Sequence, residues 1–254
     1  MKRLHNKVAL ISGAAAGIGK ACAQRFVTEG AKVLVADMAI ERGAELAREL
    51  GPEAVFQKLD VSSADSFAKA IEEAIRAWGR LDILVNNAGI ALPAVAVQET
   101  SDADFDRLIN VNLRGCFNGC KLAYPHLKQT NGCVLNMSSM SGITGQERHA
   151  IYAATKGAIN ALTKSMAVDW GKEGIRVNAL CPTGVWTDTL RAWADVQPNK
   201  PEIENYLDRI HSLGYCPGPE EIASVAAFLC SDEARFVTGC LMPVSGGSEC
   251  GYKL

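Results

Sequence analysis

Short apolar runs alternate with segments of helical period along this chain. Seven runs are almost continuously apolar, which is typical of strands buried on both faces, and they cover residues 7–12, 31–37, 54–61, 81–89, 132–139, 174–182 and 240–247. The segments between them place apolar residues at helical spacing, as Phe67, Ile71, Ala74 and Trp78 do within residues 64–79. Strands of this kind alternating with helices favour an α/β fold whose parallel sheet is covered on both faces.

The length is enough for one large core or two small ones, but no stretch rich in Pro, Gly and Ser divides the sequence. We therefore expect a single domain spanning residues 1–254. One segment, residues 183–219, departs from the rhythm of the rest, with two tryptophans, four prolines and mixed charge. We expect this segment to form a substrate lid at the edge of the sheet rather than a second domain.

Composition and charge narrow the function classes. The net charge of −2 gives no electrostatic basis for binding nucleic acid or an anionic membrane. The apolar runs are too short for a transmembrane helix, and the first residues do not resemble a signal peptide. The nine cysteines form no CxxC motif, and the nearest pair, Cys116 and Cys120, has a spacing that favours helix packing over a metal site. We expect a reduced, cytoplasmic protein without a metal.

Three glycines follow the first predicted strand directly, in the stretch "SGAAAGIG" that contains Gly13, Gly17 and Gly19. Glycines let a backbone turn tightly and approach a pyrophosphate, and the helix that follows offers free N–H groups. A tight turn without a ligand is the plainer interpretation, but the strand before and the amphipathic helix after favour a dinucleotide site. The second strand ends in Asp37, where a carboxylate accepts hydrogen bonds from the adenosine ribose and repels a 2′-phosphate. With no basic residue at positions 14–16 or 38, this pattern predicts NAD rather than NADP.

The stretch "YAATK" places Tyr152 and Lys156 one helical turn apart, on the same face of a helix. Taken alone, such a pair is an exposed lysine beside a half-buried tyrosine. Together with "NNAG" (86–89), "NVNLRG" (110–115) and "NMSS" (136–139), however, the glycine loop and this pair resemble the short-chain dehydrogenase/reductase family over nearly the whole chain. The resemblance implies a Rossmann-like, doubly wound sheet of seven parallel strands with helices on both faces, assembled as a homotetramer or homodimer.

The resemblance also assigns roles residue by residue. Tyr152 matches the general acid/base of the family, Lys156 the cation that favours its phenolate and binds the nicotinamide ribose, Ser139 the hydrogen-bond donor to the substrate oxygen, and Asn112 the support of a water relay. The matched cofactor-binding positions, beside Tyr152 and Lys156, are Gly13, Gly17, Ile18, Gly19, Asp37, Asp60, Val61, Asn86, Ala88, Gly89, Val185 and Thr187. The sequence departs from the family pattern at Ser12 (usually Thr), Thr183 (usually Gly) and Ser245 (usually Asp).

The substrate is less clearly encoded. Polar and aromatic residues near the expected site, namely Gln146, His149, Trp186 and Trp193, favour a small polyhydroxylated or anionic ligand. The stretches "KLAYPHLK", "TGQ…YAATKGA" and "GGSECGY" resemble the branch of L-fucose and related sugar dehydrogenases, which also contains hydroxysteroid dehydrogenases. We therefore expect NAD-dependent interconversion of a secondary alcohol and a ketone, or of a lactol and a lactone, on a sugar, sugar acid or polyol. A 3-oxoacyl or hydroxysteroid enzyme of the same fold, and a non-catalytic NAD(H)-binding sensor or scaffold, are the alternatives.

Overall fold

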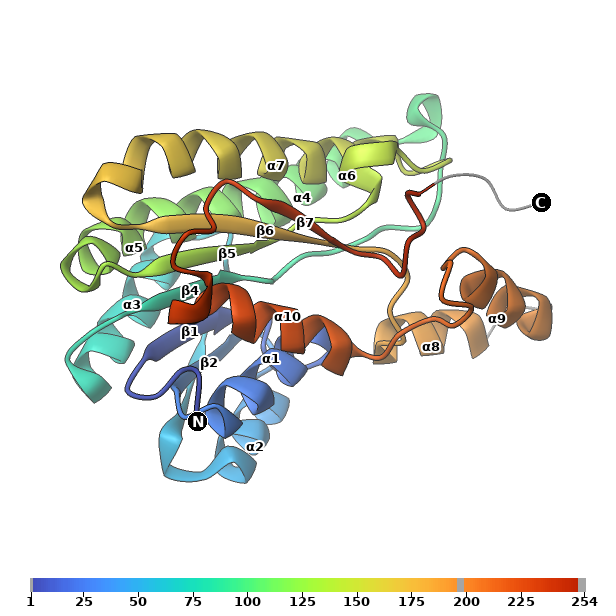
Figure 1. Ribbon diagram of the computed structural model, residues 1–254. Coiled ribbons are helices and arrows are strands. Elements are labelled where there is room, and N and C mark those ends of the chain that lie inside the picture. The colour runs from blue at the N-terminus through green and yellow to red at the C-terminus, as the bar shows by residue number, and fades with distance from the viewer. Residues whose placement is uncertain (1, 196–198, 251–254) are drawn as a thin grey trace.

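The computed structural model describes residues 2–195 and 199–250, and it contains the predicted sheet (Figure 1). Seven parallel strands lie in the order β3-β2-β1-β4-β5-β6-β7. They are β1 (Val8–Ser12), β2 (Lys32–Asp37), β3 (Ala54–Lys58), β4 (Ile83–Asn86), β5 (Cys133–Met137), β6 (Arg176–Pro182) and β7 (Leu241–Val244). All seven predicted strands are confirmed, although several are shorter than their apolar runs. The largest difference is at residues 81–89, where only Ile83–Asn86 pair as a strand.

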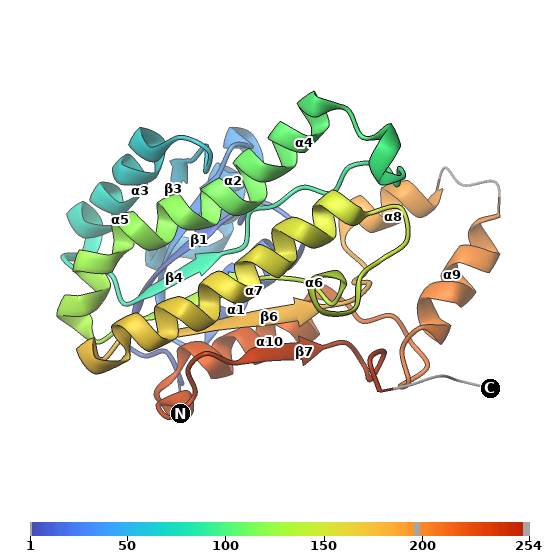
Figure 2. The ribbon, with the colours of Figure 1, turned by 90° about the horizontal axis from the view of Figure 1, so that it is seen from above.

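Two helical layers sandwich the sheet (Figure 1), and Figure 2 looks down onto one of them. One layer packs α1 (Gly17–Thr28), α2 (Ile40–Leu50) and α10 (Pro219–Cys230) against strand residues such as Ile11, Val33 and Val85. The other packs α3 (Ala64–Trp78), α5 (Gly115–Thr130) and α7 (Ala150–Trp170) against Leu10, Leu34 and Val134. Because successive strand residues point to opposite faces, both sets must be apolar, which is why the strands are nearly continuous apolar runs. The remaining helices are α4 (Asp102–Leu108), α6 (Ser141–Thr144), α8 (Asp188–Asp195) and α9 (Lys200–Arg209).

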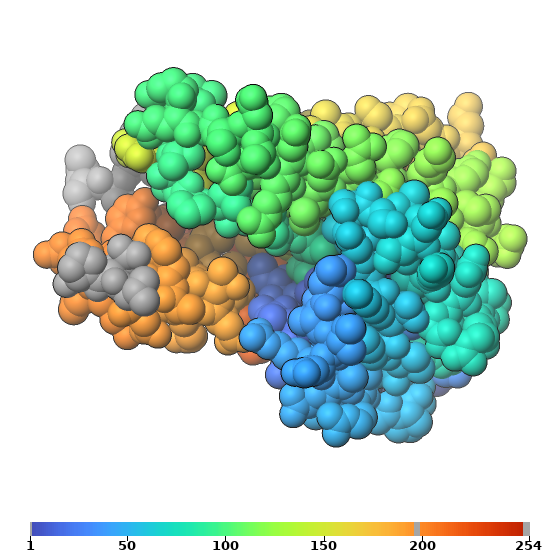
Figure 3. Space-filling model, turned by 180° about the vertical axis from the view of Figure 1, so that it is seen from behind, coloured from blue at the N-terminus to red at the C-terminus, as the bar shows by residue number. Residues whose placement is uncertain are grey.

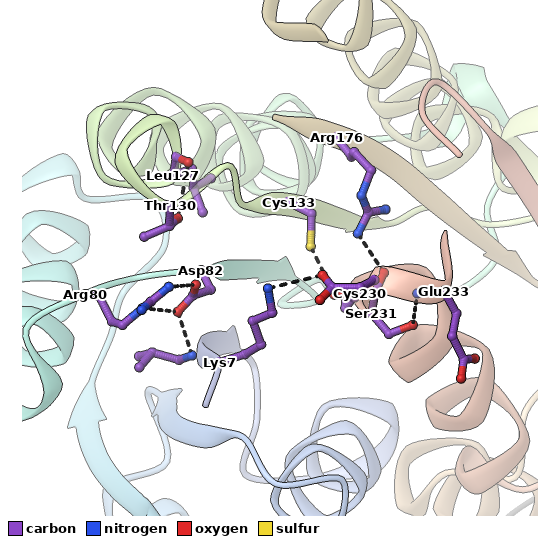
Figure 4. Close-up of polar contacts among 12 residues, drawn as sticks. Lys7, Arg80, Asp82, Leu127, Thr130, Cys133, Arg176, Cys230, Ser231 and Glu233 are labelled. Atoms are coloured by element: carbon purple, nitrogen blue, oxygen red, sulfur yellow. Dashed lines mark hydrogen bonds and ion pairs between the residues drawn. The ribbon is translucent and has the colours of Figure 1, made fainter. Parts of the chain in front are cut away.

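Polar contacts fasten the amino-terminal edge of the sheet (Figure 4). Arg80 donates two hydrogen bonds to the buried carboxylate of Asp82, at 2.9 and 2.6 Å, and Asp82 also accepts from the Val8 N–H. The hydrogen bond to Asp82 raises the pKa of the Arg80 guanidinium. Arg176 donates to the carbonyls of Leu229 and Ser231, and its guanidinium thereby caps the carboxyl end of α10. This edge is therefore fixed by side chains, and the functional loops lie at the opposite edge.

The strand order reverses at β1, which pairs with β2 on one side and with β4 on the other. In open parallel sheets, ligands bind beyond the carboxyl ends of the strands at such a switch point. The glycine loop after β1 and the "NNAG" segment after β4 both begin there. The fold thus brings two of the sequence motifs together at the position where a dinucleotide is expected.

The segment 183–219 contributes α8 and α9, which extend beyond the carboxyl edge of the sheet (Figures 1 and 2). Residues 196–198 of this segment lie outside the described residues. Its far end is held by the turn after β7: the Leu213 N–H donates to the Gly246 carbonyl at 3.1 Å and the Ser212 hydroxyl to the Gly247 carbonyl at 2.8 Å. Over the described ranges, no helix is both long and apolar enough to cross a membrane.

Candidate active site

The three glycines of the first loop are required for different reasons. Gly13 and Gly17 have φ of +65° and +53°, the left-handed region that favours glycine. Gly19 has no such constraint, but a Cβ there would lie 2.1 Å from the Gly13 carbonyl oxygen and 2.5 Å from the Asn87 side-chain nitrogen. The loop is therefore folded so tightly on itself that no side chain fits at position 19 in the first turn of α1. The N–H groups of the first turn of α1 are the donors that an anion at this helix N-terminus would meet.

Asn87 holds the glycine loop against the end of β4. Its side-chain amide donates to the carbonyls of Ser12 and Gly13, each at 3.0 Å, and its backbone N–H donates to the Ser12 hydroxyl at 3.1 Å. The Ala88 N–H also donates to that hydroxyl, at 3.1 Å. Serine thus serves where the family usually has threonine. Sequence reasoning missed Asn87; its only signal was a second amide in "NNAG".

Asn86 has the opposite orientation. Its side-chain amide points into the protein and donates to Asn136 Oδ1 at 2.9 Å and to the Cys120 sulfur at 3.2 Å. Cys120 and Cys116 both lie buried on α5, where Cys116 donates to the same Asn136 oxygen at 3.3 Å. The Asn86 side chain therefore lies inside the core and is used in contacts with α5 and β5. Only the backbone of Asn86 is left to contact a cofactor at this position.

The carboxylate of Asp37 lies between the glycine loop and the start of α2. One oxygen accepts from the Ala15 N–H and the other from the Ala39 N–H, both at 2.9 Å. Asp60 is used similarly near α3, since its carboxylate accepts from the backbone and hydroxyl of Ser62 at 3.0 and 2.7 Å. Both acids are thereby oriented by fixed donors at the positions where the sequence predicts contacts with a dinucleotide. Val61 is buried and packs against Gly115.

Lys156 is 4% exposed, yet no carboxylate among the described residues pairs with it. Its ammonium donates to the Met137 carbonyl at 2.7 Å and lies 5.6 Å from the centre of the Tyr152 ring. Tyr152 is half-buried, and over residues 2–195 and 199–250 its hydroxyl has no hydrogen-bond partner. The site thus places a buried ammonium beside a phenol, one helical turn apart on α7.

Asn112 connects this pair to the segment after β4. It lies in a π-helical turn, Ile109–Arg114, a geometry often found at functional sites. Its side-chain oxygen accepts from the Ile90 N–H at 2.8 Å, and its amide donates to the Ile90 carbonyl at 3.0 Å and to the Thr155 hydroxyl at 3.2 Å. A Cβ on Gly89 would lie 3.4 Å from the Asn112 oxygen and 3.5 Å from the Lys156 nitrogen. Gly89, Asn112 and Lys156 thus meet at one point.

Ser139 lies directly after β5, and its loop is tied to α7. The Ser139 oxygen accepts from the backbone and hydroxyl of Ser141, at 3.2 and 3.0 Å. The neighbouring Ser138 is buried and donates to the Lys156 carbonyl at 3.1 Å, while Asn160 donates to the Gly142 carbonyl at 3.1 Å. Ser138 is therefore structural, and Ser139 is the partly exposed member of the pair.

The chain after β6 returns to the glycine loop. Val185 is buried, and the Thr187 methyl lies where a Cβ on Gly17 would meet it at 3.1 Å. Thr183, which stands where the family has glycine, donates from its hydroxyl to the Ser245 carbonyl at 3.3 Å. The departure at Thr183 is thus accommodated by a bond to the end of β7.

The expected substrate residues are brought together only in part. The His149 ring meets the Tyr152 ring edge-on at a centroid distance of 6.3 Å, whereas Gln146 is exposed. Trp186 stacks under the Arg191 guanidinium at 5.2 Å, and Trp193 is 48% exposed on α8. Figure 3 shows a hollow between the orange surface of the 183–219 segment and the green surface that precedes α4. Tyr152, Lys156 and the glycine loop lie at the carboxyl edge of the sheet, the edge beyond which α8 and α9 extend.

Comparison with known proteins agrees with this geometry. Residues 13–249 match the sequence model of a family described as enoyl-(acyl carrier protein) reductase. The chain is 40% identical to meso-2,3-butanediol dehydrogenase of Serratia marcescens over 97% of its length and 96% of that protein. It is 39% identical to L-fucose dehydrogenase of Bos taurus, over 98% of its length and 92% of that protein.

Solved structures agree as well. A 3-ketoacyl-(acyl-carrier-protein) reductase from Brucella melitensis, complexed with NADH, superposes with a TM-score of 0.91 at 33% identity, over 96% of this chain and 99% of that one. ElxO with NADP bound superposes with a TM-score of 0.90 at 31% identity, over 97% of this chain and all of that one (100%). With the sheet order, the glycine loop and the Ser139, Tyr152 and Lys156 placement, these matches show that the chain is an oxidoreductase of the short-chain dehydrogenase/reductase family.

Proposed function

We propose that this protein interconverts a secondary alcohol and a ketone, or a lactol and a lactone, on a small polar substrate, with NAD as the hydride carrier. One observation carries the proposal: the buried Lys156 ammonium has no carboxylate partner among the described residues and lies beside a tyrosine whose hydroxyl is unused. A structural lysine at this depth would be expected to pair with an acid. Here the positive charge of Lys156 can interact with the Tyr152 phenol and with a ligand bound beside it.

A nicotinamide held beside Tyr152 and Lys156 would supply the acceptor for a hydride from the carbinol carbon. Tyr152 accepts the hydroxyl proton in the same step and returns it in the reverse direction. Lys156 stabilises the phenolate that accepts this proton, and the Met137 carbonyl fixes the position of its ammonium. Ser139 donates a hydrogen bond to the substrate oxygen. Asn112, which is hydrogen-bonded to both Ile90 and Thr155, supports a water relay that carries protons between Lys156 and solvent.

Asp37 supports the preference for NAD. Its carboxylate is held by two backbone donors at the end of β2, so it cannot easily turn away from an adenosine ribose. A 2′-phosphate beside it would meet a fixed negative charge, whereas ribose hydroxyls would find an acceptor. The glycine loop contributes no basic residue at positions 14–16 that would offset this repulsion.

The relatives support a small polar substrate: one is named for a butanediol and another for L-fucose. His149 beside Tyr152, and Trp186 and Trp193 on the proposed lid (183–219), supply the polar and aromatic faces that such ligands use. A 3-oxoacyl or hydroxysteroid substrate remains the alternative, favoured by the acyl-carrier-protein reductase among the structural neighbours.

We also propose a homotetramer or homodimer in a reducing, cytoplasmic setting. Phe105 on α4, Phe117 on α5 and Val168 on α7 are 44, 46 and 81% exposed, which is typical of helix faces covered by a second subunit. The cysteines, including the adjacent Cys133 and Cys230, are all free. Light scattering of the purified protein tests the assembly, and a monomer would contradict it.

The test of function is NADH or NADPH formation by the purified protein on a panel of diols, sugars, sugar acids, steroids and 3-hydroxyacyl thioesters. NAD and NADP are compared in parallel for each substrate. Turnover of one polar class, with NAD preferred, supports the proposal. Turnover confined to steroids or acyl thioesters, or a preference for NADP, contradicts it. NADH binding without any turnover favours the sensor alternative.

A further inference from the structure

Arg148, four residues before Tyr152, has a backbone conformation that is unusual for its residue type. Its φ is +57°, in the left-handed region that a side chain with a Cβ rarely adopts. Such conformations persist only where surrounding contacts hold them, and they gather at functional sites. The contacts of Arg148 all lead to one place, the segment of residues 90–99 that follows "NNAG".

Three hydrogen bonds join Arg148 to this segment. The Val95 N–H donates to the Arg148 carbonyl at 2.8 Å. The Arg148 guanidinium donates to the Ala94 carbonyl and to the Glu99 carboxylate, both at 3.3 Å. The ion pair with Glu99 is about half exposed on both sides, so it contributes little by itself. The short backbone bond to Val95 is the stronger link, and it depends on the direction in which the left-handed conformation turns the Arg148 carbonyl.

The other end of the same segment is fixed at the proton-transfer site. Ile90 exchanges two hydrogen bonds with Asn112, and Gly89 lies against both Asn112 and the Lys156 ammonium. Residues 90–99 therefore span from Lys156 on one side to the residue before His149 on the other. Figures 1 and 2 place this segment and the loop before α7 at the same end of the molecule as α8 and α9. In Figure 3 the green surface there borders the hollow.

We propose that Arg148 is a positioning residue: its left-handed backbone clamps residues 90–99 as the substrate-side wall of the active site. This rests on the proposed function insofar as the wall faces an alcohol substrate. The wall sets how tightly that substrate is held, so loosening it should raise KM. Because Tyr152, Lys156 and Ser139 are positioned by α7 and β5, kcat and nucleotide affinity should change little.

Two pairs of variants separate the backbone from the side chain. Arg148→Val is β-branched and disfavours positive φ, whereas Arg148→Gly keeps the conformation and loses only the guanidinium. Val95→Pro removes the N–H donor, whereas Val95→Ala keeps it. KM for the best alcohol of the panel, kcat and the Kd for NADH are measured for each, together with hydrogen exchange of peptides covering residues 90–99 and residues 7–12.

We expect Arg148→Val and Val95→Pro to raise KM about tenfold, with NADH affinity within twofold of the parent and faster exchange only in the 90–99 peptide. Arg148→Gly and Val95→Ala should raise KM less than threefold. Equal KM effects in Arg148→Gly and Arg148→Val would overturn the backbone clamp, as would faster exchange with an unchanged KM. If the parent turns over no alcohol, the proposed function fails separately. The exchange data then decide the clamp, and unchanged exchange in both Arg148→Val and Val95→Pro overturns it.

Discussion

The glycine loop gives the sharpest quantitative prediction, because Gly19 in this loop and Gly79 at the end of α3 differ in what constrains them. Gly79 ends α3 with φ +75°, and no atom lies within 4 Å of where its Cβ would be. Alanine there meets only the conformational cost of the left-handed region, about 1 kcal/mol. Gly19 is the reverse case: its φ is ordinary, but the space is filled. A comparison of the two therefore separates backbone strain from crowding.

The free-energy cost of crowding at Gly19 can be estimated from the distances to its neighbours. A Cβ on Gly19 would force the Gly13 carbonyl oxygen from 2.1 Å toward the 3.4 Å of ordinary contact, a shift of about 1.3 Å. The Asn87 amide, at 2.5 Å from the same position, would have to retreat as well. Overpacking of this kind costs about 1–3 kcal/mol. We expect Gly19→Ala to lower the free energy of unfolding by about 2–3 kcal/mol, against about 1 kcal/mol for Gly79→Ala.

The two variants should differ more strongly in nucleotide binding. The carbonyl that must move belongs to the loop whose N–H groups would receive the pyrophosphate. Gly19→Ala should weaken NADH binding at least about a hundredfold, or about 2.7 kcal/mol, whereas Gly79→Ala should leave it unchanged. Urea unfolding at fixed protein concentration and titration of NADH fluorescence measure both quantities. Parental NADH affinity in Gly19→Ala would refute the assignment of this loop to the dinucleotide.

Three further outcomes are expected. Asp37→Asn should narrow the ratio of kcat/KM for NAD over NADP at least about tenfold, since it removes the charge that repels a 2′-phosphate; an unchanged ratio contradicts the role of Asp37. Burial raises the pKa of the Cys22 thiol to about 12, so the unfolded chain loses this proton first. The free energy of unfolding should therefore fall as pH rises above about 9, by up to about 1.4 kcal/mol per pH unit, with a smaller slope in Cys22→Ala. Equal slopes in the two proteins would refute that attribution. Under native conditions a thiol reagent should quickly modify Cys250, which is exposed, and spare the buried thiols until denaturant is added; rapid native modification of Cys22 would contradict this.

Much of the fold was predictable because its signals are local. A strand buried on both faces must be a continuous apolar run, so β1, β2 and β5 were visible in the sequence. The family motifs then placed Asn112, Ser139, Tyr152 and Lys156 in one site, and the fold brings their elements to the same edge of the sheet. The i, i+4 spacing of the tyrosine and lysine was sufficient to predict that they share a helix face.

The parts that were missed depend on orientation and register. Asn86 and Asn87 are the same residue type, and only the pairing of Asn86 with Asn136 across β4 and β5 shows which amide points into the core. Asn87 is then free to hold the glycine loop. The left-handed conformation of Arg148 is equally invisible in sequence, because arginine has no preference for positive φ. The roles of Asn86, Asn87 and Arg148 are thus set by backbone geometry, which their residue types do not reveal.

The central claim is that Tyr152 transfers the proton, and one comparison tests it most directly. Tyr152→Phe removes a hydroxyl that has no structural partner within the described ranges, whereas Tyr124→Phe removes one that bonds Glu173 at 2.6 Å on α5, away from the site. We predict that Tyr152→Phe binds NADH with parental affinity and loses at least about a thousandfold in kcat on the best substrate. Tyr124→Phe should keep the parental kcat. Turnover by Tyr152→Phe within tenfold of the parent would show that another group carries the proton.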